Sequence, residues 1–62
     1  VYPNPTNGLI NISEGYESLK IYDIMGEIMA SYSKRERVDI SAFIPGIYIF
    51  QLDENYRKVI KK

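Results

Sequence analysis

The stretch GIYIFQL, from Gly46 to Leu52, is the most regular part of the sequence and decides the fold class. Side chains alternate between the two faces of an extended chain, so Tyr48, Phe50 and Leu52 share one face of this segment. The other face carries two isoleucines and a glutamine, so both faces are largely apolar. A strand that is apolar on both faces is typical of the middle of a sheet. We therefore predict a central β-strand here.

The same period of two continues over most of the chain, and turn-forming residues interrupt it at short intervals. We expect further strands over residues 9–12, 18–23, 27–33, 38–40 and 56–61. These breaks leave room for one helical turn at most. The pattern predicts an all-β fold, a sandwich of about seven short antiparallel strands once the opening segment is counted. A five-stranded barrel is the nearest alternative.

The opening segment VYPNPTNG, Val1 to Gly8, contains two of the three prolines of the chain. Proline has no backbone N–H to donate to a sheet, so a strand that carries Pro3 and Pro5 is expected at a sheet edge. The Asn7-Gly8 pair that follows is typical of a tight turn. We therefore predict a stiff edge strand that turns into the first strand of the core.

The composition limits the chemistry that the domain can perform. The 62 residues form a single domain, 1–62, and a chain of this size buries only about 60% of its unfolded surface, which leaves little room for a large cleft. The sequence contains no cysteine and no histidine, which excludes thiolate and imidazole chemistry. We expect a domain that is not an enzyme and that holds no cofactor and no metal.

The charges balance overall but gather at the end of the chain. Eight basic residues offset eight acidic ones, so no overall field attracts nucleic acid or an anionic membrane. The last six residues carry four bases and no acid, which gives a cationic tip. No apolar run approaches the ~20 residues of a membrane span, so we expect no direct membrane insertion. Because the chain starts at Val1 rather than Met, we expect it to be a piece of a longer protein.

Four stretches occur in a fixed order over almost the whole chain: YPNPTNGLINI at 2–12, LKIYDIMGEIM at 19–29, VDISAFIPGIYIFQL at 38–52 and RKVIKK at 57–62. Together they resemble the C-terminal sorting domain (Por secretion system sorting domain, type A) of type IX secretion cargo in Bacteroidetes. The resemblance implies an immunoglobulin-like sandwich of about seven strands, in agreement with the fold expected from the residues. It further implies a non-catalytic signal that directs its cargo across the outer membrane and is then cleaved off.

The resemblance also implies partners and a location. The expected partners are the outer-membrane translocon, the shuttle protein and the sortase of the type IX system. The domain is expected in the periplasm during transit, and the cargo is expected to be secreted or held on the cell surface. The sortase cut is expected before Val1.

By position, the resemblance marks ten residues as candidates for recognition by this machinery. They are Pro3, Asn4, Pro5, Gly8, Gly26, Gly46, Tyr48, Lys58, Lys61 and Lys62. Each has a structural alternative: prolines and glycines shape turns, Tyr48 packs in a core, and lysines protect a sheet edge. The lysines have the strongest claim to binding, because we expect their charge to be exposed and free of packing. A partner strand could pair with the last strand while acidic groups meet these lysines.

Other functions remain open from the residues alone. A small sandwich on a secreted enzyme could be a carbohydrate-binding or adhesive module, with Tyr16, Tyr32 and Tyr56 as an aromatic platform. A nucleic-acid-binding barrel is the weakest alternative, because the net charge is zero. An unpaired edge strand could also produce a dimer of the excised domain.

Overall fold

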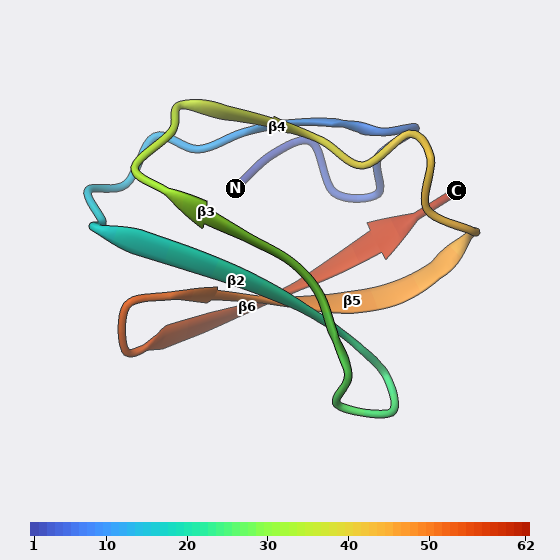
Figure 1. Ribbon diagram of the computed structural model, residues 1–62. Coiled ribbons are helices and arrows are strands. Elements are labelled where there is room, and N and C mark those ends of the chain that lie inside the picture. The colour runs from blue at the N-terminus through green and yellow to red at the C-terminus, as the bar shows by residue number, and fades with distance from the viewer.

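The computed structural model describes all residues, 1–62, and contains six β-strands and no helix. The strands are β1 (Leu9–Asn11), β2 (Ser18–Asp23), β3 (Ile28–Ser33), β4 (Arg37–Asp39), β5 (Gly46–Leu52) and β6 (Asn55–Lys61). They form two antiparallel sheets, of two and four strands, that face each other as a sandwich (Figure 1). The all-β sandwich expected from the sequence is confirmed. No helix is long and apolar enough to cross a membrane.

The larger sheet has the strand order β3-β2-β5-β6. β5 lies between β2 and β6, as its two apolar faces predict, with Phe50 opposite Ile21 on one side and Arg57 on the other. β2 also pairs with β3, and the register shifts once near the start of β3. β3 and β6 are therefore the two edges of this sheet.

The smaller sheet pairs β1 with β4 and places Ile10 opposite Val38. These two side chains and Ile40 are buried, because they point from the smaller sheet toward the larger one. Leu19 and Ile21 of β2 face them across the sandwich. Alternation along each strand thus brings the inward sets predicted from the sequence into one core.

The core contains eleven buried apolar residues from both sheets and their connections. Its members are Ile10, Ile12, Tyr16, Leu19, Ile21, Val38, Ile40, Tyr48, Phe50, Leu52 and Val59. Burying one such side chain contributes about 1.5–3 kcal/mol relative to leaving it exposed. With no disulfide, packing of this set is the main source of stability.

The opening segment lies along an edge, as predicted, but it does not form a seventh strand. It makes two isolated bridges, Tyr2 with Asn11 and Thr6 with Lys61, and so touches both sheets. The Thr6 bridge is parallel to β6, so this segment runs beside the edge of the larger sheet. The two prolines prevent a continuous ladder, because they supply no N–H.

Candidate functional site

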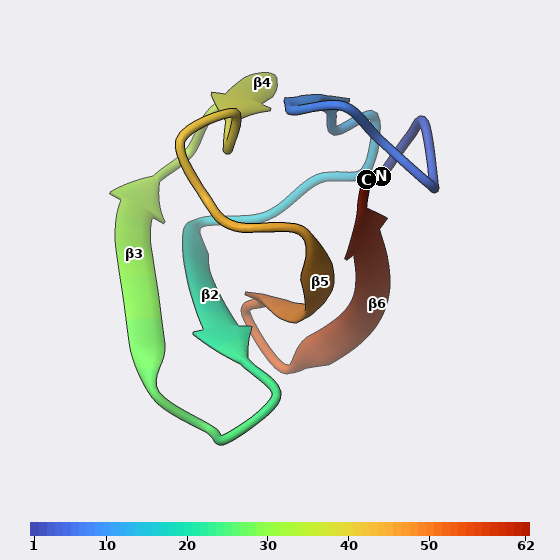
Figure 2. The same cartoon turned by 90° about the vertical axis from the view of Figure 1, so that its right-hand side faces the viewer.

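Candidate residues from three separated stretches of the sequence lie at one end of the larger sheet. The turn that contains Gly26 joins the end of β2 to the start of β3, and Asp23 of β2 pairs with Tyr48 of β5. Gly46 at the start of β5 pairs with Lys61 near the end of β6. Figure 2 views the molecule toward this end, with the β2–β3 turn below and the end of β6 to the right. The fold thus brings three of the resembling stretches side by side.

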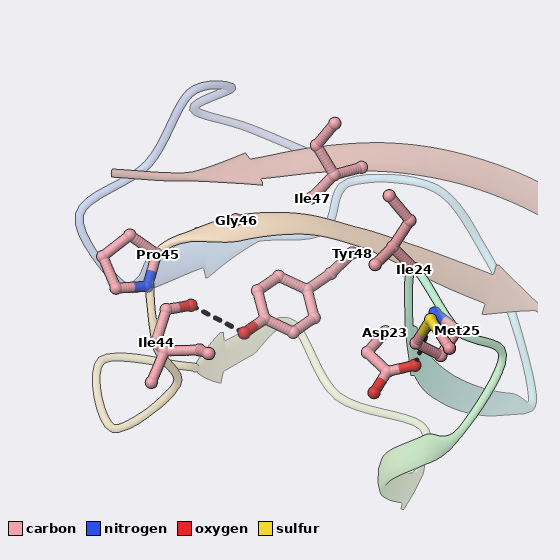
Figure 3. A pocket seen from close by; sticks show the side chains of 8 residues that line it. All are labelled: Asp23, Ile24, Met25, Ile44, Pro45, Gly46, Ile47 and Tyr48. Atoms are coloured by element: carbon pink, nitrogen blue, oxygen red, sulfur yellow. Dashed lines mark hydrogen bonds between the residues drawn. The ribbon is translucent and has the colours of Figure 1, made fainter.

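A shallow pocket of about 260 Å³ opens between the β2–β3 turn and the start of β5. It is lined by Asp23, Ile24, Met25, Ile44, Pro45, Gly46, Ile47 and Tyr48 (Figure 3). The candidates Gly46 and Tyr48 line the pocket directly. Gly26 does not line it but comes directly after Met25, which does. The pocket therefore joins parts of two resembling stretches.

Tyr48 supports the pocket from below. Its side chain is buried, and its hydroxyl donates a 2.6 Å hydrogen bond to the carbonyl oxygen of Ile44 (Figure 3). Its ring also packs against Phe43, with 5.2 Å between the ring centroids. These contacts hold the loop before β5 in place. The core role that the sequence left open for Tyr48 is therefore present, and the ring also lines the pocket.

Asp23 and Gly26 shape the other wall. One oxygen of the Asp23 carboxylate accepts hydrogen bonds of 2.9 Å from the backbone N–H groups of Met25 and Glu27. Gly26 has a φ of 87°, which favours glycine, and its N–H donates to the Asp23 carbonyl oxygen. The turn is thus held by its own backbone bonds, and it projects its apolar side chains outward.

Four apolar side chains around the pocket are exposed to solvent. The exposed fractions are 75% for Ile24, 82% for Met25, 76% for Ile44 and 40% for Ile47. Clustered apolar side chains on a surface are typical of interaction sites. These four residues were not among the candidates predicted from the sequence, although apolar residues inside the turns DIMG and FIPG were a visible signal.

The opening motif lies beside the last strand. The Asn4 side-chain amide donates to the Lys58 carbonyl oxygen at 2.8 Å, and its oxygen accepts from the Ile60 N–H at 2.9 Å. Thr6 continues this pairing, because its N–H donates to the Ile60 carbonyl oxygen and its carbonyl oxygen accepts from the Lys62 N–H. Asn4 and Thr6 together cover the edge of β6 from residue 58 to 62. Pro3 and Pro5 flank Asn4 and are exposed.

Gly8 is required by close packing. A Cβ at this position would lie 2.7 Å from the Cβ of Ser41, and the φ of 152° is one that other residues rarely adopt. The Gly8 carbonyl oxygen accepts a 2.7 Å hydrogen bond from the Ile40 N–H. Gly8 therefore lets the opening segment pass directly against the residues that follow β4.

The three lysines of the basic end do not share one environment. Lys58 and Lys62 are exposed, whereas only 8% of Lys61 is exposed, so the expectation of a fully exposed lysine cluster is wrong for Lys61. Alternation along β6 points Val59 and Lys61 toward the sandwich, and Thr6 bridges to Lys61. The Lys61 ammonium donates to the Lys62 carbonyl oxygen at 3.1 Å, as expected for a lysine that buries its stem and keeps its charge near the surface.

The three tyrosines of the alternative binding module do not form a shared platform. Tyr16 is buried, and its hydroxyl bonds both the N–H and the carbonyl oxygen of Arg35. Tyr32 is half-buried and lies beneath the Arg35 guanidinium, 4.4 Å from the ring centroid. Tyr56 alone is largely exposed. The arrangement therefore lacks the row of exposed rings that stacking against a sugar needs.

Two further aspartates close turns away from the pocket. Asp53 accepts hydrogen bonds from the N–H groups of Glu17 and Ser18, which fixes the start of β2 to the β5–β6 turn. Asp39 accepts a 2.8 Å bond from the Ser41 N–H, and this bond lowers the pKa of Asp39 below its ordinary value. No group of three or more His, Cys, Asp or Glu side chains is placed to hold a metal ion.

A family described as the secretion system C-terminal sorting domain matches residues 1–62, the whole chain. No curated protein and no solved structure matches it. The family match agrees with the resemblance noted in the sequence, and it identifies the role of the domain as a C-terminal sorting signal for type IX secretion, whose cargo is secreted or held on the cell surface. The chain therefore belongs to the family of type IX secretion C-terminal sorting domains of Bacteroidetes.

Proposed function

We propose that this domain acts without catalysis, as a folded address that the type IX machinery recognises in the periplasm and that is cleaved off after export. The outer-membrane translocon, the shuttle protein and the sortase are the proposed partners. One observation carries the proposal: residues from three separated stretches of the sequence meet at one end of the larger sheet. Such a surface exists only in the folded domain, so the machinery would read a shape rather than a linear peptide.

We place the recognition surface on the apolar pocket and on the lysines beside it. The exposed side chains of Ile24, Met25 and Ile44 offer an apolar contact, and the pocket has room for an aliphatic or aromatic side chain of the partner. Lys62 is exposed at the same end of the sheet, and Lys58 is exposed in the middle of β6, opposite Ile49; both can meet acidic groups. Gly8, Asn4 and Tyr48 serve this surface by holding the segments that carry it.

The pairing of a partner strand with β6 is not part of this proposal. Asn4 and Thr6 already occupy the hydrogen-bonding groups of β6 near its end. A partner strand would have to displace the opening segment and lose these bonds. Side-chain contacts at the pocket need no such rearrangement.

A secretion assay tests the function itself. A fluorescent protein is given an N-terminal export signal and, through a short linker, this chain at its C-terminus, in a Bacteroidetes host with an intact type IX system. The fluorophore is expected outside the cell, and deletion of the translocon should retain it in the periplasm. Retention in the intact host, with the domain shown to be folded, would contradict the proposal.

Substitutions at the pocket test where recognition occurs. Ile24→Lys and Ile44→Lys place charge on side chains that are already exposed, so the fold should tolerate them. Leu9→Lys is the matched control, because Leu9 is half-exposed and lies on the smaller sheet. We expect the two pocket variants to reduce secretion at least tenfold and the control to secrete normally. Normal secretion by all three variants would show that the pocket is not part of the recognition surface.

The lysines are tested separately. Lys58→Ala with Lys62→Ala removes exposed charge, whereas Lys61→Ala removes a mostly buried stem. We expect the double change to lower secretion at unchanged thermal stability, and Lys61→Ala to lower stability. Normal secretion by a variant in which all three lysines are alanine would show that the basic end has no role in recognition.

A further inference from the structure

The β3 edge of the larger sheet has backbone groups with no partner. Ser18 directs its carbonyl oxygen toward the β5–β6 turn, where it accepts from the Asp53 N–H. Alternation then turns the backbone of Leu19 and Ile21 toward β3, opposite Tyr32 and Ala30. Ser31 and Ser33 therefore direct their N–H and carbonyl groups away from the sheet. Four hydrogen-bonding groups along β3 face solvent.

This edge carries few of the features that normally prevent strand pairing. Natural edge strands use lysine, proline or a covering segment to avoid pairing with another chain. From Ile28 to Ser33 there is no charged residue and no proline, and no other segment pairs with the outer side of β3. The bulge lies at its start, beside Ile28, and leaves the rest regular. The side chains of Ile28 and Met29 are 59% and 42% exposed, which adds apolar surface to the open edge.

The charges at the two ends of β3 are complementary to each other. Glu27 comes directly before the strand, and Lys34 and Arg35 come directly after it. The two ion pairs within the chain both use Glu14, so none of these three side chains is paired. The Arg35 guanidinium is held near the end of β3 by its contact with the Tyr32 ring. An antiparallel partner with the same sequence would bring Glu27 of each copy to the basic end of the other.

We propose that β3 is the site at which a second copy of this chain binds, by antiparallel pairing of the two β3 strands about a two-fold axis at Ser31. Ser31 then lies opposite Ser31 of the second copy, and Met29 lies opposite Ser33. The pairing joins two four-stranded sheets into one continuous sheet, and the outward N–H and carbonyl groups of Ser31 bond those of Ser31 in the second copy. This proposal does not rest on the recognition surface, which uses other residues.

The dimer is weak because its interface is small. Each copy contributes one six-residue strand, so the buried area is well below the ~1,200 Å² of a standard interface. Main-chain hydrogen bonds and the two charged ends supply the specificity. Association is therefore expected to depend on concentration and to weaken with added salt, which screens exposed charges.

Sedimentation and amide NMR of the purified domain, over a range from micromolar to millimolar, test the pairing. The mass should rise from monomer to dimer, and β3 pairing should form no larger species, because the larger sheet of each copy has a single open edge. The amides of Ser31 and Ser33 should shift with concentration, whereas those of Ala30 and Tyr32, which face β2, should shift much less. A domain that stays monomeric, or one whose shifts map to β6, would overturn the proposal.

Paired variants separate the edge from the fold. Ser31→Pro removes the outward N–H and blocks close approach, while an edge strand can hold proline where the N–H faces water. Ser31→Thr is its control, because it keeps the N–H and favours a strand. We expect at least a tenfold increase in the dimer dissociation constant for Ser31→Pro and little change for Ser31→Thr. Circular dichroism and thermal melting establish that both are folded.

Charge reversal tests the register. Glu27→Lys places a cation against the basic end of the second copy and should weaken the dimer at least fivefold. Adding Lys34→Glu should restore part of the affinity, and a mixture of the Glu27→Lys and Lys34→Glu single variants should form heterodimers more readily than either forms homodimers. Unchanged association of all charge variants would overturn the antiparallel arrangement.

Discussion

The two edges of the larger sheet differ in what lies beside them. At β6, Asn4 and Thr6 bind the backbone of Lys58, Ile60 and Lys62, so the opening segment covers the strand. At β3, nothing covers the outward groups of the strand. The difference shows how a short proline-rich segment can close a sheet without becoming part of it: proline lacks the backbone donor, and the Asn4 side-chain amide supplies both a donor and an acceptor.

The rigidity of the opening segment favours its position beside β6. Fixing a residue costs about 1–2 kcal/mol of backbone entropy, and a residue that is already restricted loses less on folding. Pro3 and Pro5 restrict the chain on both sides of Asn4. The segment can therefore hold the Asn4 amide against β6 at a smaller entropic cost than a flexible chain would need.

The largest predicted effect concerns the point where the opening segment joins the smaller sheet. Gly8→Ala places a Cβ 2.7 Å from the Ser41 Cβ at a φ that alanine rarely adopts, so we expect a loss of roughly 3 kcal/mol in the free energy of unfolding. Gly15→Ala is the control, because no atom lies within 4 Å of its added Cβ. Urea denaturation measures both. Similar stability for the two variants would show that Ser41 moves aside freely.

The next effect concerns Thr6, which fixes the opening segment through its buried hydroxyl. The buried Thr6 hydroxyl donates to the Leu9 carbonyl oxygen and accepts from the Gly8 N–H, both at 3.0 Å. Thr6→Ala leaves both groups without this partner and should cost about 2 kcal/mol. Thr6→Ser retains the hydroxyl and should cost less. If the two variants melt at the same temperature, the hydrogen bonds of the Thr6 hydroxyl do not stabilise the opening segment.

A smaller effect is expected from the Asn4 side chain, which binds the edge of β6. Asn4→Ala removes two hydrogen bonds to β6 at an exposed site, so we expect a loss of about 1 kcal/mol. Hydrogen exchange is the sharper measurement, because the Ile60 amide loses its acceptor while the fold remains. Its exchange should accelerate several-fold and approach that of the outward Ser31 amide on the open edge. Unchanged protection at Ile60 would mean that the Asn4 side chain does not pair with β6 in solution.

Much of the sandwich follows from alternation, and the differences arise where distant segments meet. The predicted strand at Ser18–Asp23 is confirmed with the same bounds, and Tyr48, Phe50 and Leu52 are buried on one face as expected. Local period alone determines these features. The burial of Lys61 could not be predicted in this way, because it depends on which segment lies over the end of β6.

The pocket was unpredictable for the same reason. Ile24 and Ile44 lie in turns twenty residues apart, and each turn alone gives no sign of the other. Their proximity depends on the β2–β5 pairing, in which Asp23 lies opposite Tyr48. A match of the stretches to a family indicates which residues matter, but the sheet order is needed to show that they share one surface.

The smallest predicted effect lies on the smaller sheet, away from both edges. The Ser41 N–H, and secondarily the Ser41 side chain, hold the pKa of Asp39 below its ordinary value of 3.8. A carboxyl whose pKa is lower in the folded state stabilises the fold above its unfolded pKa, and this contribution disappears as the pH falls through the folded pKa. Because Asp39 is fully exposed, water screens the interaction and the effect is small.

Comparing thermal melts of the natural domain and Asp39→Asn between pH 5 and pH 2 isolates this contribution from that of the other carboxyls. The natural domain should have the larger advantage at pH 5, and its advantage should shrink toward pH 2; a constant difference would show that the Asp39–Ser41 contact does not depend on the charge of the carboxylate.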